Sequence, residues 1–250
     1  RAGTVQPRAY CSGLARAAVG LGAQIYQQSP VTRVERKNGA WCVHANGHTV
    51  TVPRLLLATN AYHQLAEGAY APEYVVVSYS QFATAPLTQA QRSRILPGRE
   101  GCWDTALVMS SIRTDEKGRL IVGGMGNVDG PAASIHANWA RRKLRRLYPD
   151  LGELPFEHQW QGKIAMTKDH IPKVVEFGPS AYAVFGYSGR GISSGTVIGA
   201  AAAKALLGAG PEVLPLPVIK KYSERFKKVM GAYYEFGASL THATRPGLLG

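Results

Sequence analysis

The sequence has little cysteine, little charge and no long apolar run. Its three cysteines, Cys11, Cys42 and Cys102, are widely spaced and no CxxC pair occurs, which excludes a disulfide framework and a zinc site of the usual spacing. Charged residues make up only 18% of the chain, and no apolar run reaches the ~18 residues that a membrane-spanning helix needs. We therefore expect a cytoplasmic protein, from a reducing compartment, with no membrane span.

What the chain does contain is enough apolar material for a packed core. Hydrophobic residues make up 45% of its 250 residues, which excludes intrinsic disorder. Its 28 glycines and 15 prolines indicate a globular protein with many turns.

The charge is strongly unbalanced, since 29 lysines and arginines face 16 acidic residues and give a net charge of +13. A solvated basic face accounts for this, and so does an anionic partner. The basic residues gather in two segments that we expect to be helical, 141–146 and 220–228. Nucleic-acid binding is not expected, because aromatic and basic residues do not alternate in the manner of RNA-reading modules.

Hydrophobic periodicity predicts an opening helix that starts at Gln6-Pro7 and ends at Gly20. Asn38-Gly39 and Asn46-Gly47 are hairpin dipeptides, so we expect a β-meander next. Further along we expect strands at 24–26, 31–36, 41–44, 49–52, 54–58, 74–85, 106–113, 119–123, 157–166 and 181–185, and helices at 134–148, 192–207 and 218–236. The run 54–58 is apolar enough to be a strand buried on both faces.

A glycine-rich turn at 186–191 joins a predicted strand to a small-residue helix. Gly189 and Gly191 have no side chains, and the first turn of a helix leaves N–H groups unpaired, so a flat or anionic ligand could approach the backbone here. An ordinary tight turn has the same sequence. A Rossmann fingerprint with Gly195 and the later Glu212 fits less well, because no strand precedes Glu212 and little chain follows it.

Six stretches carry a resemblance over nearly the whole chain: Val5-Gln6-Pro7 with the helix into Gly22-Ala23, Ser29-Pro30-Val31, LLLATNAY at 55–62, Trp160-Gln161-Gly162, the segment 167–172 (TKDHIP), and GYSGRGI at 186–192. In this order they resemble the DAO-type FAD-dependent oxidoreductases, the relatives of glycine, sarcosine and γ-glutamylputrescine oxidases. LATNAY and GYSGRG are most similar to the γ-glutamylputrescine oxidase branch.

The resemblance implies an α/β (α+β) fold, in which an antiparallel-sheet substrate domain is inserted into an incomplete FAD-binding domain. We expect FAD-binding parts at 1–63 and 162–213, the substrate domain at 64–161, and a C-terminal helix and tail at 214–250. The family's opening GxGxxG turn and ribose-binding acid are not found here. With Arg1 in place of Met, the sequence resembles roughly the C-terminal three fifths of such an enzyme, so the missing segment would come in cis or from another chain.

The resemblance also assigns cofactor-binding residues. Val31 matches the valine whose backbone contacts the adenine. A plain core valine of a β-strand is an equally good interpretation of this residue. Thr59, Asn60 and Ala61 follow a buried strand, where ligands of open sheets bind; a simple turn is the alternative. Four residues match the turn that faces the flavin pyrimidine ring, where N–H donors would stabilise the negative charge of reduced flavin: Gly189, Arg190, Gly191 and Ile192.

Two departures from the sarcosine oxidase pattern narrow the substrate. Ser193 stands where those relatives carry a carboxylate-binding lysine, and Gly162 stands where they carry the cysteine that attaches flavin. We therefore expect non-covalent FAD. Tyr187 is a candidate for lining the substrate pocket. Arg113 and Trp103 are further candidates. The alternative interpretations, at least as good, are that Arg113 is a surface arginine and Trp103 a core tryptophan.

These inferences predict an FAD-dependent oxidoreductase that oxidises a C–N bond of a small amine or amino acid by hydride transfer to flavin, after which the imine is hydrolysed. No catalytic side chain and no metal site is identified, since the seven histidines are scattered. The alternatives are a catalytically incomplete fragment and a basic anion-binding module.

Overall fold

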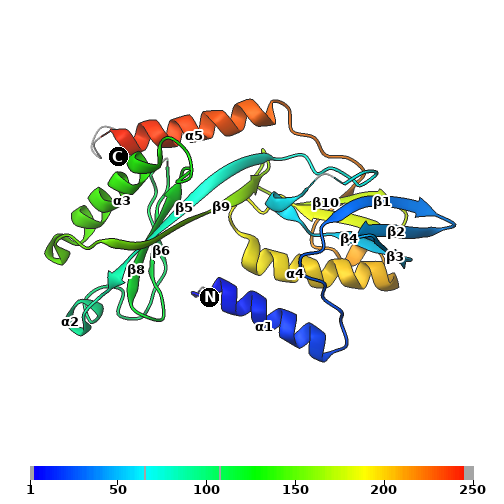
Figure 1. Cartoon of the computed structure of the whole chain (residues 1–250), viewed down its shortest axis with the longest axis horizontal. Helices are drawn as coiled ribbons and strands as arrows, with labels where there is room; N and C mark the ends of the chain where they lie inside the picture. Colours follow the sequence, from blue (N-terminus) through cyan, green and yellow to red (C-terminus); the bar gives the residue numbers. More distant parts are fainter. Residues whose placement is uncertain (1–2, 65, 107, 245–250) are drawn as a thin grey trace. The chain divides into compact units, whose positions relative to one another are not determined.

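A computed structural model of the chain describes residues 3–64, 66–106 and 108–244 (Figure 1). It divides into two compact units. Unit 1 takes its described residues from 1–10, 77–163 and 228–250, and unit 2 from 11–76 and 164–227. The units change after residues 10, 76, 163 and 227. The FAD-binding and substrate domains, with boundaries expected after residues 63, 161 and 213, stay a prediction.

Unit 2 contains a three-stranded antiparallel meander. Its strands are β1 (Val31–Lys37), β2 (Ala40–Ala45) and β3 (His48–Val52). Both connecting dipeptides, Asn38-Gly39 and Asn46-Gly47, have positive φ at each residue, which is the conformation that two-residue hairpin turns require. The predicted meander is therefore confirmed.

A second, four-stranded sheet of unit 2 has the order β12-β10-β11-β4. Its strands are β12 (Val218–Ile219), β10 (Lys173–Gly178), β11 (Ala181–Phe185) and β4 (Leu55–Leu57). β4 is parallel to β11, which is antiparallel to β10. Every residue of β11 is buried. The helix α4 (Gly191–Lys204) packs its Ile198 and Ala202 against this sheet, in one cluster with Val174 and Val184.

Unit 1 is built on a five-stranded sheet of order β6-β7-β8-β5-β9. The strands are β5 (Val75–Pro86), β6 (Cys102–Trp103), β7 (Ser111–Thr114), β8 (Arg119–Met125) and β9 (Phe156–Met166). The ends of β5 and β9 extend into unit 2.

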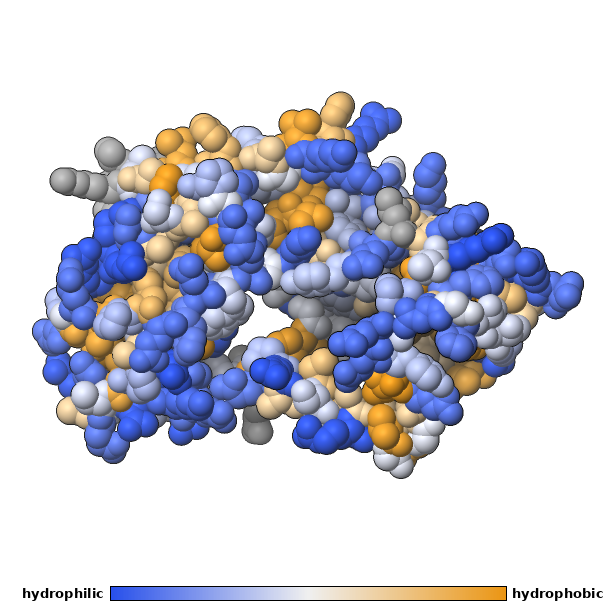
Figure 2. All heavy atoms as spheres, in the orientation of Figure 1, coloured by the Kyte–Doolittle hydropathy of each residue, from blue (hydrophilic) through white to orange (hydrophobic). Residues whose placement is uncertain are grey.

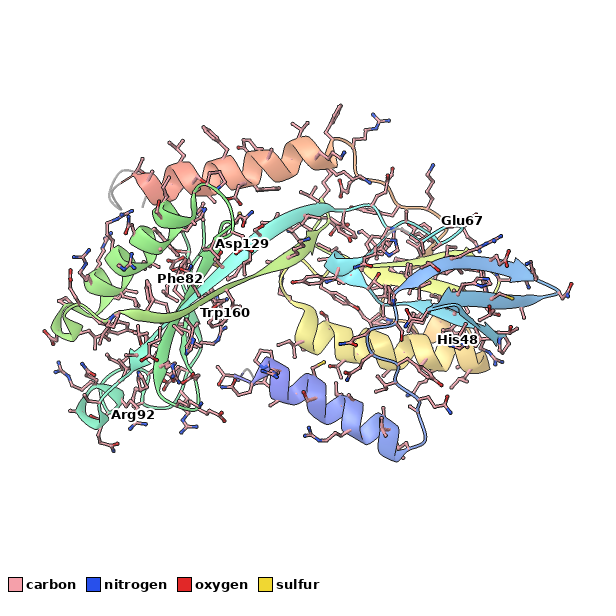
Figure 3. All side chains as sticks on the ribbon, in the orientation of Figure 1. His48, Glu67, Phe82, Arg92, Asp129 and Trp160 are labelled. Carbon is pink, nitrogen blue, oxygen red and sulfur yellow. The ribbon has the colours of Figure 1, made fainter. Side chains whose placement is uncertain are left out.

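The helix α3 (Ala133–Leu147) covers one face of this sheet. Phe82, fully buried and labelled in Figure 3, packs there with Val122, Trp139 and Leu144. Gly124 is required for this packing, because a Cβ at that position would lie 2.4 Å from the Trp139 ring.

Three further helices are α1 (Pro7–Gly20), α2 (Gln89–Arg92) and α5 (Lys227–Ala243). α1 has no buried residue. α2 is a single turn held by a capping box between Thr88 and Gln91. α5 buries Ala238 and His242 in unit 1.

Four sequence predictions are corrected by the structure. Residues 24–26 form no strand, and the strand predicted at 106–113 is short, because β7 begins only at Ser111. Leu107 lies outside the described residues. The terminal helix begins at 227 and not at 218, since 218–219 pair with β10. Leu55–Leu57 are half-buried, not buried on both faces.

Candidate functional site

The candidate site of unit 2 begins at the edge where two parallel strands end. Leu55 pairs with Ala181 and Leu57 with Ala183, so the chain leaves β4 and β11 at the same side of the sheet. LATNAY continues from β4 into a 3-10 turn at Asn60–Tyr62, and the glycine turn continues from β11. Carboxyl ends of parallel strands are where open sheets bind their ligands.

Asn60 joins these two motifs, which lie 126 residues apart in the sequence. Its side-chain Oδ1 accepts a 3.0 Å hydrogen bond from the Gly186 N–H, and its carbonyl accepts one of 2.7 Å from the Tyr74 hydroxyl. Its φ is +42°, a left-handed conformation that asparagine tolerates better than most residues. The two predicted segments are thus joined through Asn60 and Gly186, and their shared role as a cofactor site stays a prediction.

The neighbours of Asn60 divide between core and surface. Ala61 is buried, whereas Thr59 is exposed and lies 3.1 Å from His63 through its Oγ1 and the His63 Nδ1. The Nε2 of His63 is buried and has no hydrogen-bond partner among the described residues, and burial lowers the pKa of His63. The sequence analysis missed this imidazole, whose only signal is its place directly after LATNAY.

The glycine turn holds its shape through its own backbone. Gly186 has φ +83°, and a Cβ there would lie 2.5 Å from Thr167 Cγ2, so only glycine fits. Ser188 donates its N–H to Ala165 O, and Arg190 donates to Tyr187 O. Gly189 has φ +85° and is exposed.

The turn delivers an open helix N-terminus. Arg190 is the N-cap of α4 and supplies no side-chain cap, and the first turn contains no acidic residue. Gly191 and Ile192 are exposed. Free N–H groups and the positive end of the helix dipole therefore face outward at residues 191–193, as a binding site for an anionic or acceptor-rich ring edge requires. These residues fit the acceptor edge of the FAD implied by the sequence.

Two further predicted residues belong to unit 2, Val31 away from the glycine turn and Tyr187 within it. Val31 begins β1 in the other sheet, opposite Ala45, and is 38% exposed. Tyr187 is half-buried and packs along α4, where Cβ atoms built at Gly191 and Gly195 would lie 3.6 and 3.7 Å from its side chain. Burial raises the pKa of its phenol. These contacts are those of a packing residue, and its place in a substrate pocket stays a prediction.

Unit 1 carries a separate candidate substrate surface, the face of its sheet opposite α3. Arg113 on β7 is half-buried, and no carboxylate of the described residues forms an ion pair with it. Burial lowers the pKa of its guanidinium, and nearby Tyr79 acts in the opposite direction. A desolvated arginine without a protein anion is suited to a ligand carboxylate.

Polar side chains surround Arg113 on the same face. Strand register places Trp103 opposite Ser111, and Ser111 opposite Gly123, which pairs in turn with Gln81. The Tyr79 hydroxyl donates to Ser111 Oγ at 3.0 Å, and Gln81 Oε1 is buried without a partner among the described residues. Trp103 is 69% exposed, so the core-tryptophan reading is wrong.

Sequence reasoning missed Tyr79, Ser111 and Gln81. Alternation along β5 gives a signal for two of them, because Tyr79 and Gln81 must face away from the core residue Phe82. Ser111 has no such signal, because the sequence predicted a strand over 106–113, whereas β7 begins only at Ser111.

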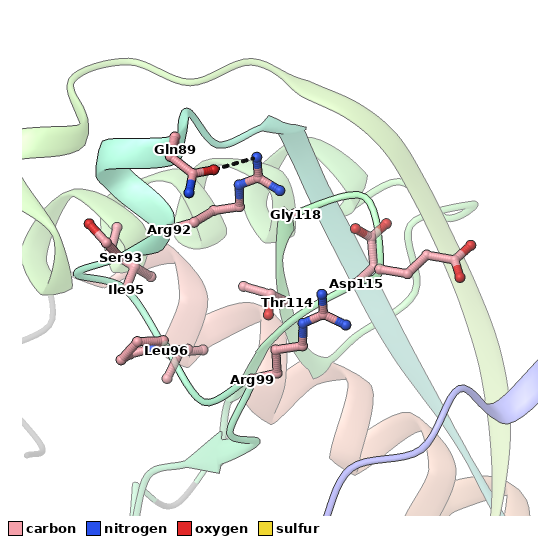
Figure 4. A pocket seen from close by; sticks show the side chains of 11 residues that line it. Gln89, Arg92, Ser93, Ile95, Leu96, Arg99, Thr114, Asp115 and Gly118 are labelled. Carbon is pink, nitrogen blue, oxygen red and sulfur yellow. Dashed lines mark hydrogen bonds between the residues drawn. The ribbon is translucent and has the colours of Figure 1, made fainter.

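A cavity of about 350 Å³ in unit 1 lies between α2 and the turns at 95–99 and 114–118 (Figure 4). Arg92 and Arg99 line it, and Arg92 donates to Gln89 Oε1 at 3.4 Å. None of the predicted site residues lines this cavity, and we do not include it in the candidate site.

The cysteines and acids of the described residues add no further chemistry. Cys11, Cys42 and Cys102 are free thiols, and no group of three metal-ligating side chains is found within 3–64, 66–106 and 108–244. The segment Gly191–Ala209 is long and apolar enough to cross a membrane by those two measures. Its Ile198, Ala202 and Ala205 are buried in the core of the second sheet, whereas Ile192, Val197 and Leu207 are exposed.

Comparison with known proteins gives consistent similarities. The family described as DAO, FAD dependent oxidoreductase, matches residues 1–205. The chain is 31% identical over 221 residues to the "Probable oxidoreductase OrdL" of Rhizobium meliloti, covering 87% of this chain and 50% of the relative. It is 24% identical over 189 residues to the "Gamma-glutamylputrescine oxidoreductase" of Escherichia coli, covering 75% and 44%.

Among solved structures, the fold is similar to an L-proline dehydrogenase from P. horikoshii. The TM-score is 0.66 at 19% identity, and the match covers 84% of this chain and 57% of that one. The chain spans about half the length of the curated relatives it matches.

Proposed function

Because the chain belongs to the FAD-dependent oxidoreductase (DAO) family, we propose that it supplies the flavin-ring and substrate-binding parts of an enzyme that oxidises the C–N bond of a small amine or amino acid. The observation that carries this proposal is the hydrogen bond from Gly186 N–H to Asn60 Oδ1, which fixes two distant family motifs beside the open start of α4. FAD is the family's cofactor.

In this proposal one part of the chain binds the flavin ring and another binds the substrate. The free N–H groups at 191–193 would hold the acceptor edge of the flavin ring, without covalent attachment. Arg113, with Tyr79 and Ser111 beside it, would orient the carboxylate of an amino-acid substrate. When bound, FAD accepts the hydride from the carbon that bears the nitrogen. Loss of this hydride from carbon and of a proton from nitrogen would leave an imine, which water would hydrolyse to a carbonyl compound and ammonia or an amine.

The substrate class rests on Arg113. A carboxylate-bearing amine fits a guanidinium that has no protein anion, whereas a simple amine would leave that charge half-buried and unpaired. The full-length enzyme would need the diphosphate-binding GxGxxG turn and the ribose-binding acid that the resemblance places outside this chain, from the same or another chain.

The flavin site is tested by Gly191→Val in the full-length protein. A Cβ at Gly191 would meet only Tyr187 atoms, none closer than 3.6 Å, so the fold tolerates the side chain while the ring edge loses access to the backbone. We expect the bound-flavin absorbance of the purified protein to fall by more than tenfold.

Gly199→Val is the matched control, because it adds the same side chain to the same helix where a Cβ meets nothing within 4 Å. Equal flavin content in both variants would show that the start of α4 does not hold the ring. Full-length protein without flavin after reconstitution would contradict the proposal as a whole and favour the incomplete fragment.

A further inference from the structure

The outward face of α5 carries an exposed apolar stripe. Val229, Tyr233, Phe236 and Leu240 are 66, 65, 68 and 54% exposed. Their spacings of four, three and four residues continue with three to the exposed Ala243, so they repeat as the a and d positions of a coiled coil. Figure 2 shows apolar side chains along the edge of the molecule that α5 occupies in Figure 1.

The opposite face of α5 fixes this stripe toward the outside. Ala238 and His242 are buried in unit 1. The Glu235 carboxylate accepts a 3.0 Å hydrogen bond from Asn127 N–H, and the Arg142 guanidinium donates to the carbonyl of His242. The helix therefore cannot turn its exposed side chains inward without breaking these contacts.

The stripe is large for a surface that stays in water. At roughly 150–250 Å² for a large aromatic side chain and less for the aliphatic ones, the four exposed side chains present roughly 500 Å² of apolar area. Patches of about 300–600 Å² are the largest that a typical monomer exposes, and they are often functional surfaces. Two such faces together would bury roughly 1,000 Å², the lower limit of a specific interface.

The charge pattern identifies the occupant. The positions that flank the stripe carry no charge, as they are Met230, Ala232, Gly237 and Ser239. An identical helix therefore meets no like charge across the contact. A helix that lies on a membrane carries lysine and arginine along its length, whereas the lysines of α5, Lys227 and Lys228, stand only at its start.

We propose that the outer face of α5 is a self-association surface, on which the α5 of a second copy of this chain packs around a two-fold axis. Phe236 is the midpoint of the stripe, seven residues from both Val229 and Ala243. It therefore contacts its own counterpart whether the two helices run parallel or antiparallel.

Sedimentation velocity tests this proposal. We expect the chain to form a concentration-dependent dimer at tens of micromolar, and Phe236→Glu to weaken the dimer by more than tenfold. Leu147→Glu is the matched control, because Leu147 is an exposed apolar residue of α3 in the same unit, and it should leave the dimer unchanged. A monomeric wild type, or a dimer that survives Phe236→Glu, would overturn the proposal.

A cross-link gives a readout that does not depend on introducing a charge. In a Cys11→Ser, Cys102→Ser background, Phe236→Cys should form a disulfide dimer on mild oxidation at least ten times faster than Leu147→Cys. Equal rates would overturn the proposal. Sedimentation of monomeric protein with phosphatidylserine vesicles, lost in Phe236→Glu, would also overturn it and assign the face to a membrane.

Discussion

Arg113 shows how one side chain narrows a substrate class. Its guanidinium is half-buried on a middle strand of the unit 1 sheet, and its neighbours Tyr79 and Ser111 bond to each other. Desolvation of a charge is costly unless an opposite charge compensates it. A ligand carboxylate would supply that charge.

Replacing Arg113 should therefore weaken substrate binding more than turnover. A hydrogen bond to a charged group contributes about 1.5–3 kcal/mol, so Arg113→Ala should raise KM for an amino-acid substrate by about 10- to 100-fold, with kcat changed much less. Arg99→Ala, at an exposed arginine of the same unit, serves as the control. Steady-state kinetics that gave the same KM increase for the decarboxylated amine would refute the carboxylate role.

Asn60 provides a second prediction at this scale. Asn60→Gly tolerates the positive φ but removes the acceptor of Gly186 N–H. Leaving that N–H unpaired should cost about 1–3 kcal/mol, which urea unfolding would measure, and flavin should be lost more readily. Asn60→Asp keeps an oxygen at the same place and should behave like the wild type. Equal stability of the Gly and Asp variants would exclude the proposed bridge.

The sequence could indicate that Asn60 and the glycine turn share an edge, because each follows an apolar strand. It could not indicate which side chain reaches which amide, since that contact depends on the pairing of β4 with β11 across 126 residues. Trp103 shows the reverse case. Its size suggested a core position, but a two-residue edge strand leaves it exposed.

Among elements, those with strong local signals were predicted best. The meander follows from its Asn-Gly turns, and α3 and β11 follow from period and apolar length. The start of α5 was wrong because helical periodicity continues through 218–226, where pairing of Val218 and Ile219 with β10 takes the chain into a sheet. Such tertiary pairing leaves no local trace in sequence.

The contact of α3 with α5 contains a buried histidine pair. His136 Nδ1 and His242 Nδ1 are 2.8 Å apart, and His136 Nε2 lies 3.2 Å from Glu235 Oε1. A carboxylate only accepts, so His136 donates its Nε2–H to Glu235, and one proton lies between the two Nδ1 atoms. His242 Nε2 is buried and without a partner in the described part of the chain. The ring of His242 stacks on Trp139 at 3.9 Å.

This arrangement predicts a loss of stability in mild acid. Burial, followed by the charges of His136 and Arg142, lowers the pKa of His242 from 6.5 to about 3. The unfolded chain binds a proton as the pH falls below 6.5, whereas the folded chain does not, so the stabilisation is complete above pH 6.5 and declines toward pH 3. Unfolding free energy should fall by about 2 kcal/mol between about pH 7.5 and about pH 5.

Urea unfolding followed by tryptophan fluorescence would measure this change. His242→Gln should flatten the pH dependence, because it removes the titrating group. His158→Gln, at an exposed histidine of β9, should leave it as in the wild type. A pH dependence that persisted in His242→Gln would place its origin elsewhere, for example at His63, whose pKa is also lowered by burial.

For the whole molecule, the net charge of +13 keeps the basic anion-binding module as a competing function. The structure reduces this charge locally, since Lys143 pairs with Asp104, Arg145 with Glu153 and Lys220 with Glu176. Members of both basic clusters are thus partly neutralised by the chain itself. The remaining positive charge is dispersed over the surface, so it attracts any polyanion without selecting one polyanion over another.

Salt dependence separates this whole-molecule attraction from the proposed cofactor site. Binding that depends on released counterions weakens by about 10³-fold or more between about 50 and 200 mM salt when several phosphates are contacted. We expect the binding of heparin and DNA to weaken in this way, without preference for DNA sequence. The affinity for flavin held by the amides at 191–193 in the full-length protein should change by less than about tenfold over the same range. The reason is that those donors are dipoles and not mobile charges. Titrations of both ligands over the same salt range would decide between the functions. If the affinity for flavin fell as steeply with salt as the affinity for heparin, flavin would be bound by nonspecific attraction to a basic surface and not by the amides at 191–193.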